Sequence, residues 1–262
     1  MKVRKNISCS IVGNIRNKNP KVWLRRIESA AISPDKIIKE EIPKTTLKVT
    51  IPPWGELCLQ IYRPDMRRII LSPFRGSRGE KIWTFSGDLL KSNIPVPEPA
   101  LFLEIKRGVF VVKNYVATRW ISRAQNLGSL ALKRDISSNS DLKSKLLSGV
   151  DICGRLHNSG FVHGDLKWSN FLFVPEDDNS VILTDLDFLK RSSSLRFQGR
   201  DFARFVLSAL ERQSDPELEE MLIDRYLRGR NSTSALIEKG IRRRIAGKRK
   251  KYEGRLTASR KL

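Results

Sequence analysis

A polar cluster separates two apolar runs in the segment FVHGDLKWSNFLF, which spans residues 161–173. The carboxylate of Asp165 is followed by the ammonium of Lys167 and the carboxamide of Asn170, and Asp185 comes later, after the apolar run VIL. A carboxylate can accept the proton of an attacking hydroxyl, and a cation can neutralise charge on a transferring phosphoryl group. Amide and carboxylate oxygens are the hard ligands that Mg²⁺ prefers. These residue types, in this order, predict a site for phosphoryl transfer.

The alternative is an ordinary polar turn between buried segments, with Asp165 in the turn and Asp185 at the end of a strand. Each residue by itself favours that interpretation. Their joint spacing favours a site, because a hairpin from Asn170 to Asp185 would bring both metal ligands to the same mouth. Trp168 is interpreted as a packing residue. Asp187 either assists Asp185 or accepts hydrogen bonds behind it.

Helical and strand patterns predict the elements that must position these residues. Apolar residues recur at helical spacing over residues 142–156, and Asn158-Ser159-Gly160 ends that helix. The runs FLFV and VIL predict two short strands joined by a turn. Further helices are predicted over residues 201–210 and from the Asp-Pro-Glu triplet at residues 215–217. Residues 127–140 are rich in Ser and Asn and predict a loop.

The first half of the chain is rich in strand patterns. Residues 44–51 and 56–63 read as strands, and the sequence PPWG between them predicts a hairpin turn. Residues 66–93 read as helical. The alternating prolines of residues 94–99 then force an extended connection, and two more strands flank residues 106–108.

These elements predict an α+β fold, with a strand-rich N-terminal part, a hinge-like segment near residues 117–123 and a helix-rich C-terminal part. The predicted divisions are a basic N-terminal extension over 1–35, an N-lobe over 36–119, a C-lobe with the catalytic and metal-binding loops over 120–239, and a basic C-terminal tail over 240–262.

Composition sets bounds on the partners and on the compartment. The chain of 262 residues has 50 Lys and Arg against 28 Asp and Glu, a net charge of +22, so nucleotide phosphates, nucleic acid or an anionic membrane surface are all candidate partners. Three widely spaced cysteines fit neither a disulfide framework nor a zinc site, and they indicate a reducing cytosol. Two histidines exclude a His-rich metal site. The sequence lacks an apolar stretch of secretory or membrane-spanning length.

Two motifs resemble those of a known superfamily. HGDLKWSN resembles the catalytic loop of the protein-kinase-like fold, with Gly164 where protein kinases usually carry arginine. LTDLDF resembles their metal-binding segment, with Leu186-Asp187 in place of Phe-Gly. The pair HGDLK and TDLD is closer to the bacterial lipopolysaccharide kinases that phosphorylate heptose or Kdo of the inner core. The segments RLHNSGFVHGDLK and GRDFARFVLSAL, and the stretch from IYRPDM to IPVPEP, are also similar to that family, so the resemblance covers roughly residues 36–236.

The resemblance implies a two-lobed protein-kinase-like fold, with a small antiparallel-sheet N-lobe and a helical C-lobe. It also implies ATP-dependent transfer of a phosphoryl group to a sugar hydroxyl, with ATP and Mg²⁺ as cofactors. The roles that it implies are Asp165 as catalytic base, Lys167 as a cation assisting the transferred phosphoryl, Asn170 and Asp185 as Mg²⁺ ligands, Asp201 as a structural anchor under the loop, and His163 as a packing and hydrogen-bonding residue.

One departure from the family pattern lies in the strand-rich half. Gln60 stands where the family expects the lysine that contacts the nucleotide phosphates and pairs with a helix glutamate, for which Glu80 is the nearest candidate. Gln60 and Glu80 remain the cofactor-binding candidates, and Lys48 or Arg63 could supply the missing charge. The departure keeps a second hypothesis open: a pseudokinase that binds nucleotide without turnover.

The implied acceptor is the lipopolysaccharide core or another anionic glycolipid. Basic residues near an anionic leaflet contribute about 1 kcal/mol each to membrane attraction. The tail over residues 240–262 therefore predicts a cytoplasmic protein that is peripheral at the inner face of the inner membrane. Nucleic acid ranks lower, because the only signature for it is charge. An atypical kinase acting on protein, or near RNA, is the third hypothesis.

Overall fold

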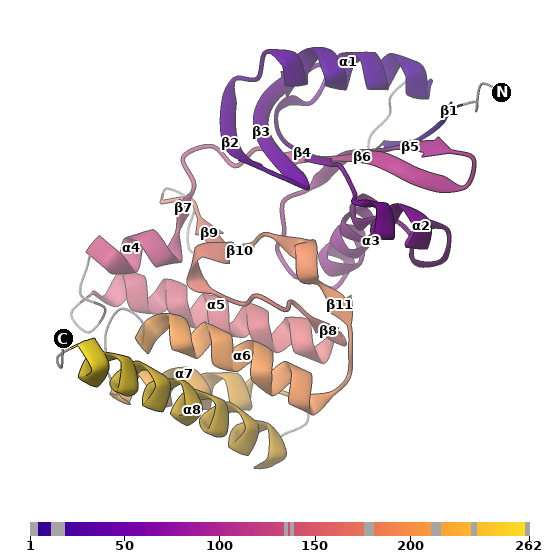
Figure 1. Ribbon diagram of the computed structural model, residues 1–262. Helices are drawn as coiled ribbons and strands as arrows, with labels where there is room; N and C mark the ends of the chain where they lie inside the picture. Colours follow the sequence, from indigo (N-terminus) through magenta and orange to yellow (C-terminus); the bar gives the residue numbers. More distant parts are fainter. Residues whose placement is uncertain are drawn as a thin grey trace. The chain divides into compact units, whose positions relative to one another are not determined.

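The computed structural model describes residues 5–11, 19–133, 136, 139–175, 181–210, 216–231 and 235–259 (Figure 1). The chain divides into two compact units. Unit 1 comprises Met1–Lys91 and Val96–Ser122, and unit 2 comprises Ser92–Pro95 and Arg123–Leu262. The last crossing between the units, after Ser122, lies inside the hinge predicted near residues 117–123.

Unit 1 is built on a six-stranded antiparallel sheet with the order β1-β5-β6-β4-β3-β2. The predicted hairpin is confirmed, because β3 and β4 pair along their full lengths from Lys44↔Tyr62 to Ile51↔Gly55. The two strands predicted around residues 106–108 are confirmed as β5 and β6. The strands are β1 (Lys5–Ile11), β2 (Lys36–Glu41), β3 (Lys44–Ile51), β4 (Gly55–Tyr62), β5 (Pro99–Arg107) and β6 (Phe110–Arg119).

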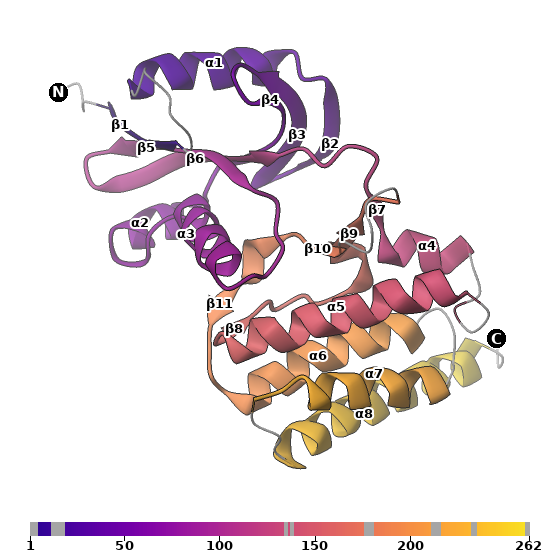
Figure 2. The ribbon, with the colours of Figure 1, turned by 180° about the vertical axis from the view of Figure 1, so that it is seen from behind.

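Helices cover both faces of this sheet. Helix α1 (Pro20–Ile32) lies on one face, and α2 (Met66–Arg75) and α3 (Arg78–Lys91) lie on the other (Figures 1 and 2). The helical pattern over residues 66–93 is therefore two helices instead of one. Gly76, with φ of 66°, interrupts the helical path because its backbone adopts a conformation that α-helices do not use.

The weakly patterned N-terminal segment contains a strand and a helix that the sequence analysis missed. β1 pairs with β5, with Ile7 opposite Ile105. In α1, Trp23 and Ile27 are buried in the same core as the inward residues of β3 and β4. The pattern was weak because α1 has only these two fully buried positions and β1 lies at the edge of the sheet.

Unit 2 is mainly helical. Its short strands form a three-stranded sheet, β10-β9-β7, and a two-stranded sheet, β11-β8. The helices are α4 (Leu127–Lys133), α5 (Ser140–Asn158), α6 (Leu195–Leu210), α7 (Pro216–Arg228) and α8 (Ala235–Ser259), with one-turn 3₁₀ helices η1 (Trp168–Asn170) and η2 (Leu186–Phe188). The strands are β7 (Gln125–Asn126), β8 (Phe161–Val162), β9 (Phe171–Phe173), β10 (Val181–Leu183) and β11 (Lys190–Arg191).

The predicted helices over 142–156 and 201–210 and the one from residue 216 are confirmed as α5, α6 and α7, although Asp215 lies outside the described residues. The loop predicted over 127–140 was wrong, because its first half forms α4. Leu127, Leu130 and Ala131 are buried there, and the side chain of Asn126 accepts a hydrogen bond from the Ser129 backbone N–H at 2.7 Å. Packing and this capping bond together outweigh the Ser/Asn composition.

Most of the segment predicted as a basic tail, from residue 240, belongs to helix α8. Three isoleucines of this helix, Ile237, Ile241 and Ile245, are buried. These residues recur every fourth position and therefore line one side of the helix, which packs against α6. In the part of the chain that the structure describes, no helix has the length and hydropathy of a membrane span.

Candidate active site

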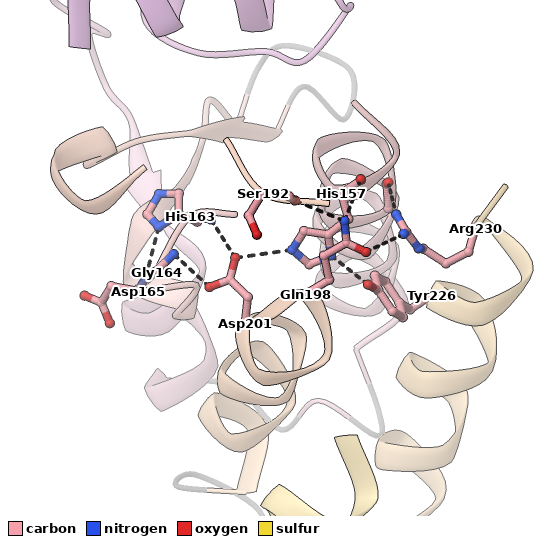
Figure 3. Close-up of polar contacts among 10 residues, drawn as sticks. His157, His163, Gly164, Asp165, Ser192, Gln198, Asp201, Tyr226 and Arg230 are labelled. Atoms are coloured by element: carbon pink, nitrogen blue, oxygen red, sulfur yellow. Dashed lines mark hydrogen bonds and ion pairs between the residues drawn. The ribbon is translucent and has the colours of Figure 1, made fainter. Parts of the chain in front are cut away.

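The loop from His163 to Asn170 is anchored from below by one buried carboxylate. Asp201, in the middle of α6, accepts hydrogen bonds from the backbone N–H groups of His163 (2.6 Å) and Gly164 (2.9 Å). The ring of His157 contacts the same carboxylate, with 3.2 Å between Nε2 and Oδ2 (Figure 3). A buried carboxylate needs several donors, and this one obtains two of them from the loop. Asp201 therefore acts as the structural anchor that the sequence predicted.

Behind Asp201, a hydrogen-bonded chain of side chains fixes the orientation of His157. Burial lowers the pKa of His157, which favours the neutral imidazole. Its Nε2–H then donates to Asp201, while Nδ1 accepts from the hydroxyl of Tyr226 at 2.6 Å. Gln198 donates to the His157 carbonyl (3.1 Å) and accepts from Arg230 (2.7 Å) (Figure 3). This hydrogen-bond network links α5, α6 and α7 beneath the loop. The sequence analysis missed three of its members, Gln198, Tyr226 and Arg230.

His163 joins the loop to the segment that carries the second motif. Its ring is fully buried. Nδ1 lies 3.3 Å from the donating backbone N–H of Asp165, and Nε2 lies 2.9 Å from the carbonyl oxygen of Thr184. Since Nδ1 accepts, Nε2 carries the proton and donates to Thr184. This packing and hydrogen-bonding role agrees with the prediction for His163.

Two of the residues predicted for phosphoryl transfer, Lys167 and Asn170, contact Asp165. The ammonium of Lys167 lies 2.6 Å from Asp165 Oδ2. The amide nitrogen of Asn170 donates to the Asp165 carbonyl oxygen at 2.9 Å, which leaves the amide oxygen as the atom that a cation would bind. Arg204 adds a second cation, with its Nε 3.8 Å from Asp165 Oδ1. The sequence analysis missed Arg204, although it follows Asp201 by one helical turn and so lies on the same face of α6.

Asp185 is brought to the same end of a hairpin as Asn170. β9 and β10 pair with Phe171 opposite Leu183. Beyond that pair, the backbone N–H and the hydroxyl of Thr184 both donate to the Asn170 carbonyl, at 2.8 and 3.0 Å. Asp185 follows with φ of 60° and ψ of 56°, a left-handed conformation that is uncommon for a residue other than glycine and that concentrates at functional sites. The predicted hairpin geometry is confirmed.

The oxygen donors of Asn170 and Asp185 fit a hard cation such as Mg²⁺. Within the described ranges, no group of three or more His, Cys, Asp and Glu side chains gathers into a metal cluster. At the hairpin end, Asn170 offers an amide oxygen and Asp185 a carboxylate, the donor types that such a cation binds.

Gly164 allows the loop to approach the second motif closely. Its φ is 88°, and a methyl group at this position would lie 2.9 Å from Phe188 Cβ and 3.1 Å from the Phe188 carbonyl oxygen. We expect Gly164→Ala to lower the unfolding free energy by about 1–3 kcal/mol and to slow phosphoryl transfer, because the loop must shift away from Phe188. Thermal melting and turnover measure the two effects.

Gly160→Ala is the matched control. Gly160 also has a positive φ, 75°, but an added methyl group there meets nothing within 4 Å. It therefore carries the backbone strain without the close contact. Equal losses of turnover in the two variants would contradict a role for the close approach at Gly164.

Gln60 lies in unit 1 on the face of the sheet that α3 covers. It pairs with Val116 of β6, whose side chain lies against Gly79 of α3. The Gln60 side chain is half-buried, and its Oε1 accepts from the Tyr62 hydroxyl at 2.8 Å. The Gln60 side chain therefore lies on the face of the sheet that α3 covers. The pairing of β4 with β6 fixes this side, so it is not the result of a one-residue shift in the predicted strand register.

Of the two cations considered as replacements, one shares the face of Gln60. Lys48 of β3 pairs with Cys58, two residues from Gln60, so alternation along the strands turns Lys48 and Gln60 to the same side. Arg63 instead donates to the Thr45 hydroxyl at 2.8 Å, and Thr45 pairs with Ile61, which belongs to the opposite, α1-facing core. The structure therefore favours Lys48 over Arg63.

Glu80 lies in the first turn of α3 and is exposed. Its backbone N–H donates to the Ser77 hydroxyl at 3.0 Å. Among the hydrogen bonds of the described residues, none joins Glu80 to Gln60. Lys48 is held by an ion pair with Glu56 and lies over the Trp120 ring, 5.2 Å from its centroid.

Comparison with solved structures defines the class of fold. The chain is similar to the structure described as WaaP in complex with acyl carrier protein, with a TM-score of 0.64 and 18% identity over 88% of this chain and 95% of that one. Vaccinia related kinase 3 matches with a TM-score of 0.46 and 12% identity, over 82% of this chain and 87% of that one. A Stt7 homolog from Micromonas algae, soaked with ATP, matches with a TM-score of 0.44 and 13% identity, over 59% and 49%. The predicted α+β, protein-kinase-like fold is confirmed.

The sequence itself places the chain in a family within this class. The model of the lipopolysaccharide kinase (Kdo/WaaP) family matches residues 75–226, more than half of the 262 residues, and the chain belongs to that family. A search of curated protein sequences gives no significant match. Membership confirms the predicted activity class, an ATP-dependent kinase of lipopolysaccharide sugars, and does not favour the pseudokinase alternative.

Proposed function

We propose that this kinase transfers the γ-phosphoryl group of Mg·ATP to a sugar hydroxyl of the lipopolysaccharide inner core, with Asp165 as its catalytic base. The observation that carries this proposal is the anchoring of the loop. Asp201 and His163 hold its backbone so that Asp165 and Asn170 adjoin the hairpin end that leads to Asp185. In this arrangement residues 120–239 serve as the catalytic lobe and residues 36–119 as the nucleotide-binding lobe.

In the proposed mechanism, Asp165 orients the acceptor hydroxyl and takes its proton. The acceptor oxygen forms a bond to the γ-phosphorus while the bond between that phosphorus and the β–γ bridging oxygen breaks, so ADP leaves. Lys167, 2.6 Å from Asp165, neutralises charge on the transferring group. Arg204 positions the carboxylate from its other oxygen. Bound Mg²⁺, held by Asn170 and Asp185, would neutralise the charge of the nucleotide phosphates.

The test of this proposal is incubation of the purified protein with Mg·ATP and purified core oligosaccharide. We expect ADP release that depends on the oligosaccharide and one new phosphate on a single sugar, located by NMR. ATP binding without turnover would instead identify a pseudokinase, and transfer to protein alone would identify an atypical protein kinase. Loss of one core phosphate in cells that lack the protein would identify the acceptor position.

On the nucleotide side, we propose that Lys48 supplies the cation that Gln60 lacks, with Gln60 donating a hydrogen bond to a phosphate and Glu80 a lesser contributor. Lys48 shares a face with Gln60, which supports this assignment. It would have to exchange its ion pair with Glu56 for the nucleotide.

We expect Gln60→Lys to lower the KM for ATP by roughly three- to tenfold, because a charged donor to phosphate is stronger than a neutral amide. Steady-state kinetics with varied ATP measure the change. Gln60→Glu is the control and should raise KM, since it adds a negative charge at the same position. An unchanged KM in both variants would contradict a nucleotide contact at Gln60.

We also propose that the protein works at the cytoplasmic face of the inner membrane, where the exposed basic residues of α8 contribute to attraction. Two cations of α8 are already paired in the structure, Arg242 with Glu220 and Arg249 with Glu219. The exposed basic residues that remain on the described part of α8 include Lys239, Arg243, Arg244 and Lys248. These ion pairs leave fewer described cations of α8 available to an anionic membrane than the sequence alone predicts.

A further inference from the structure

Helix α2 of unit 1 carries an apolar stripe that the unit's core does not use. Met66, Ile70 and Phe74 are 71%, 56% and 87% exposed, and their spacing of four residues places them along one side of the helix. The opposite side holds Ser72, which is buried and accepts from the backbone N–H of Val111 at 2.8 Å. The stripe is thus turned away from the sheet, and folding of unit 1 leaves it in solvent.

The turn between β5 and β6 lies next to α2, on the side of the helix that holds Ser72. The bond from Val111 to Ser72 places α2 beside the start of β6, and the two ribbon views show the hairpin end next to α2 (Figures 1 and 2). Val109 and Phe110 in that turn are 64% and 40% exposed. The exposed apolar surface of the helix, which we name the α2 surface, consists of Met66, Ile70 and Phe74. Contiguous apolar surface of this kind marks an interaction site more often than scattered single residues do.

The border of the α2 surface is basic. Asp65 is the single acid among residues 63–75, and its side chain is engaged as the helix cap, accepting from the Arg68 backbone N–H at 2.8 Å. The exposed cations of α2 are Arg67, Arg68 and Arg75. Its occupant must therefore supply apolar volume at the centre and negative charge at the rim.

We propose that the α2 surface docks the protein onto an anionic bilayer, with Met66, Ile70 and Phe74 inserted at the level of the acyl-chain boundary and the arginines on lipid phosphates. A bilayer interface offers apolar depth and a negative surface together. A second copy of this chain fits less well, because symmetric contact would bring two arginine borders together. The purpose of this docking rests on the proposed function, which places the acceptor sugar on a lipid.

The test is flotation of the purified full chain with vesicles of phosphatidylcholine, with and without phosphatidylglycerol. We expect binding to the anionic vesicles, and a loss of roughly tenfold or more in Met66→Ser/Ile70→Ser/Phe74→Ser, because three inserted side chains are removed. The matched control is Ile37→Ser/Ile38→Ser/Ile42→Ser, which removes three exposed isoleucines near β2 in the same unit. It should bind as the unchanged chain does. Circular dichroism verifies that both variants are folded.

A second arm separates this inference from the proposed function. The Met66→Ser/Ile70→Ser/Phe74→Ser variant, called the α2 variant below, should phosphorylate lipid-free core oligosaccharide at the same rate as the unchanged chain. It should phosphorylate the bilayer-embedded acceptor more slowly. If the unchanged chain phosphorylates neither acceptor, the proposed function fails, whereas vesicle binding still tests the α2 surface. Equal vesicle binding by the unchanged chain and the α2 variant would overturn the inference. A dimer in the unchanged chain that becomes monomeric in the variant, without vesicle binding, would overturn it in favour of a contact between copies.

Discussion

Replacing Asp165 with asparagine is expected to reduce kcat by about three orders of magnitude, within the range that general base catalysis contributes. Asparagine has nearly the same shape, and the backbone contacts that hold the loop to Asp201 do not involve the Asp165 side chain. The amide cannot take a proton from the acceptor hydroxyl, and it no longer attracts Lys167, 2.6 Å away. ADP release in the presence of core oligosaccharide, measured at saturating ATP, gives the change in kcat.

Asp224→Asn provides the control for Asp165→Asn. Asp224 is an exposed carboxylate of α7 that pairs with Arg228 at 3.6 Å, so its replacement removes a comparable charge far from the loop in sequence. It should leave kcat within experimental error. Equal rates for Asp165→Asn and the unchanged chain, with both folded, would show that another group is the base.

Replacing Asp185 with asparagine should reduce turnover by at least about a hundredfold, because metal neutralisation of the phosphates contributes several kcal/mol. Asparagine tolerates the left-handed backbone that Asp185 adopts at φ of 60°, so the hairpin should keep its geometry. What is lost is the negative charge of the side chain that would hold the metal. A titration of rate against Mg²⁺ should show a higher half-saturating concentration as well as a lower plateau.

Asp187→Asn is the comparison for that variant, since Asp187 lies two residues on, in η2. It should reduce turnover far less and leave the Mg²⁺ requirement nearly unchanged. Stabilisation of the protein by Mg·ADP in thermal melting gives a second readout, because a bound ligand raises the stability of the folded state. If Asp187→Asn raises the Mg²⁺ requirement and Asp185→Asn does not, the metal ligand is Asp187 and not Asp185.

The elements that the sequence predicted well are those with strong local patterns. β3 and β4 were recognisable from apolar residues at alternate positions and from the PPWG turn, and α5 from a continuous apolar face ended by Gly160. Helix α4 was not, because its helical state depends on burial against the rest of unit 2 and on the Asn126 cap. The composition of a short segment carries no information about its burial by residues that are far away in the chain.

The same distinction applies to the candidate site. Asp165, Lys167 and Asn170 lie within a few residues of one another, so their chemistry is visible in one short segment. The parts that hold them are separated by long stretches of chain: Asp201 meets His163 across thirty-eight positions, and Tyr226 meets His157 across sixty-nine. No periodicity connects such pairs.

What the sequence by itself determined was the chemistry of the loop, the alternation of the sheet and the family to which the chain belongs. These follow from residue types at short spacing, where the covalent chain fixes the distances. Only the tertiary structure decided that Lys48, and not Arg63, shares the face of Gln60, and that α2 leaves an apolar surface in solvent. Both depend on which side of a strand or helix the remainder of the fold covers, because the same residues can be core or surface until a neighbouring element packs against them.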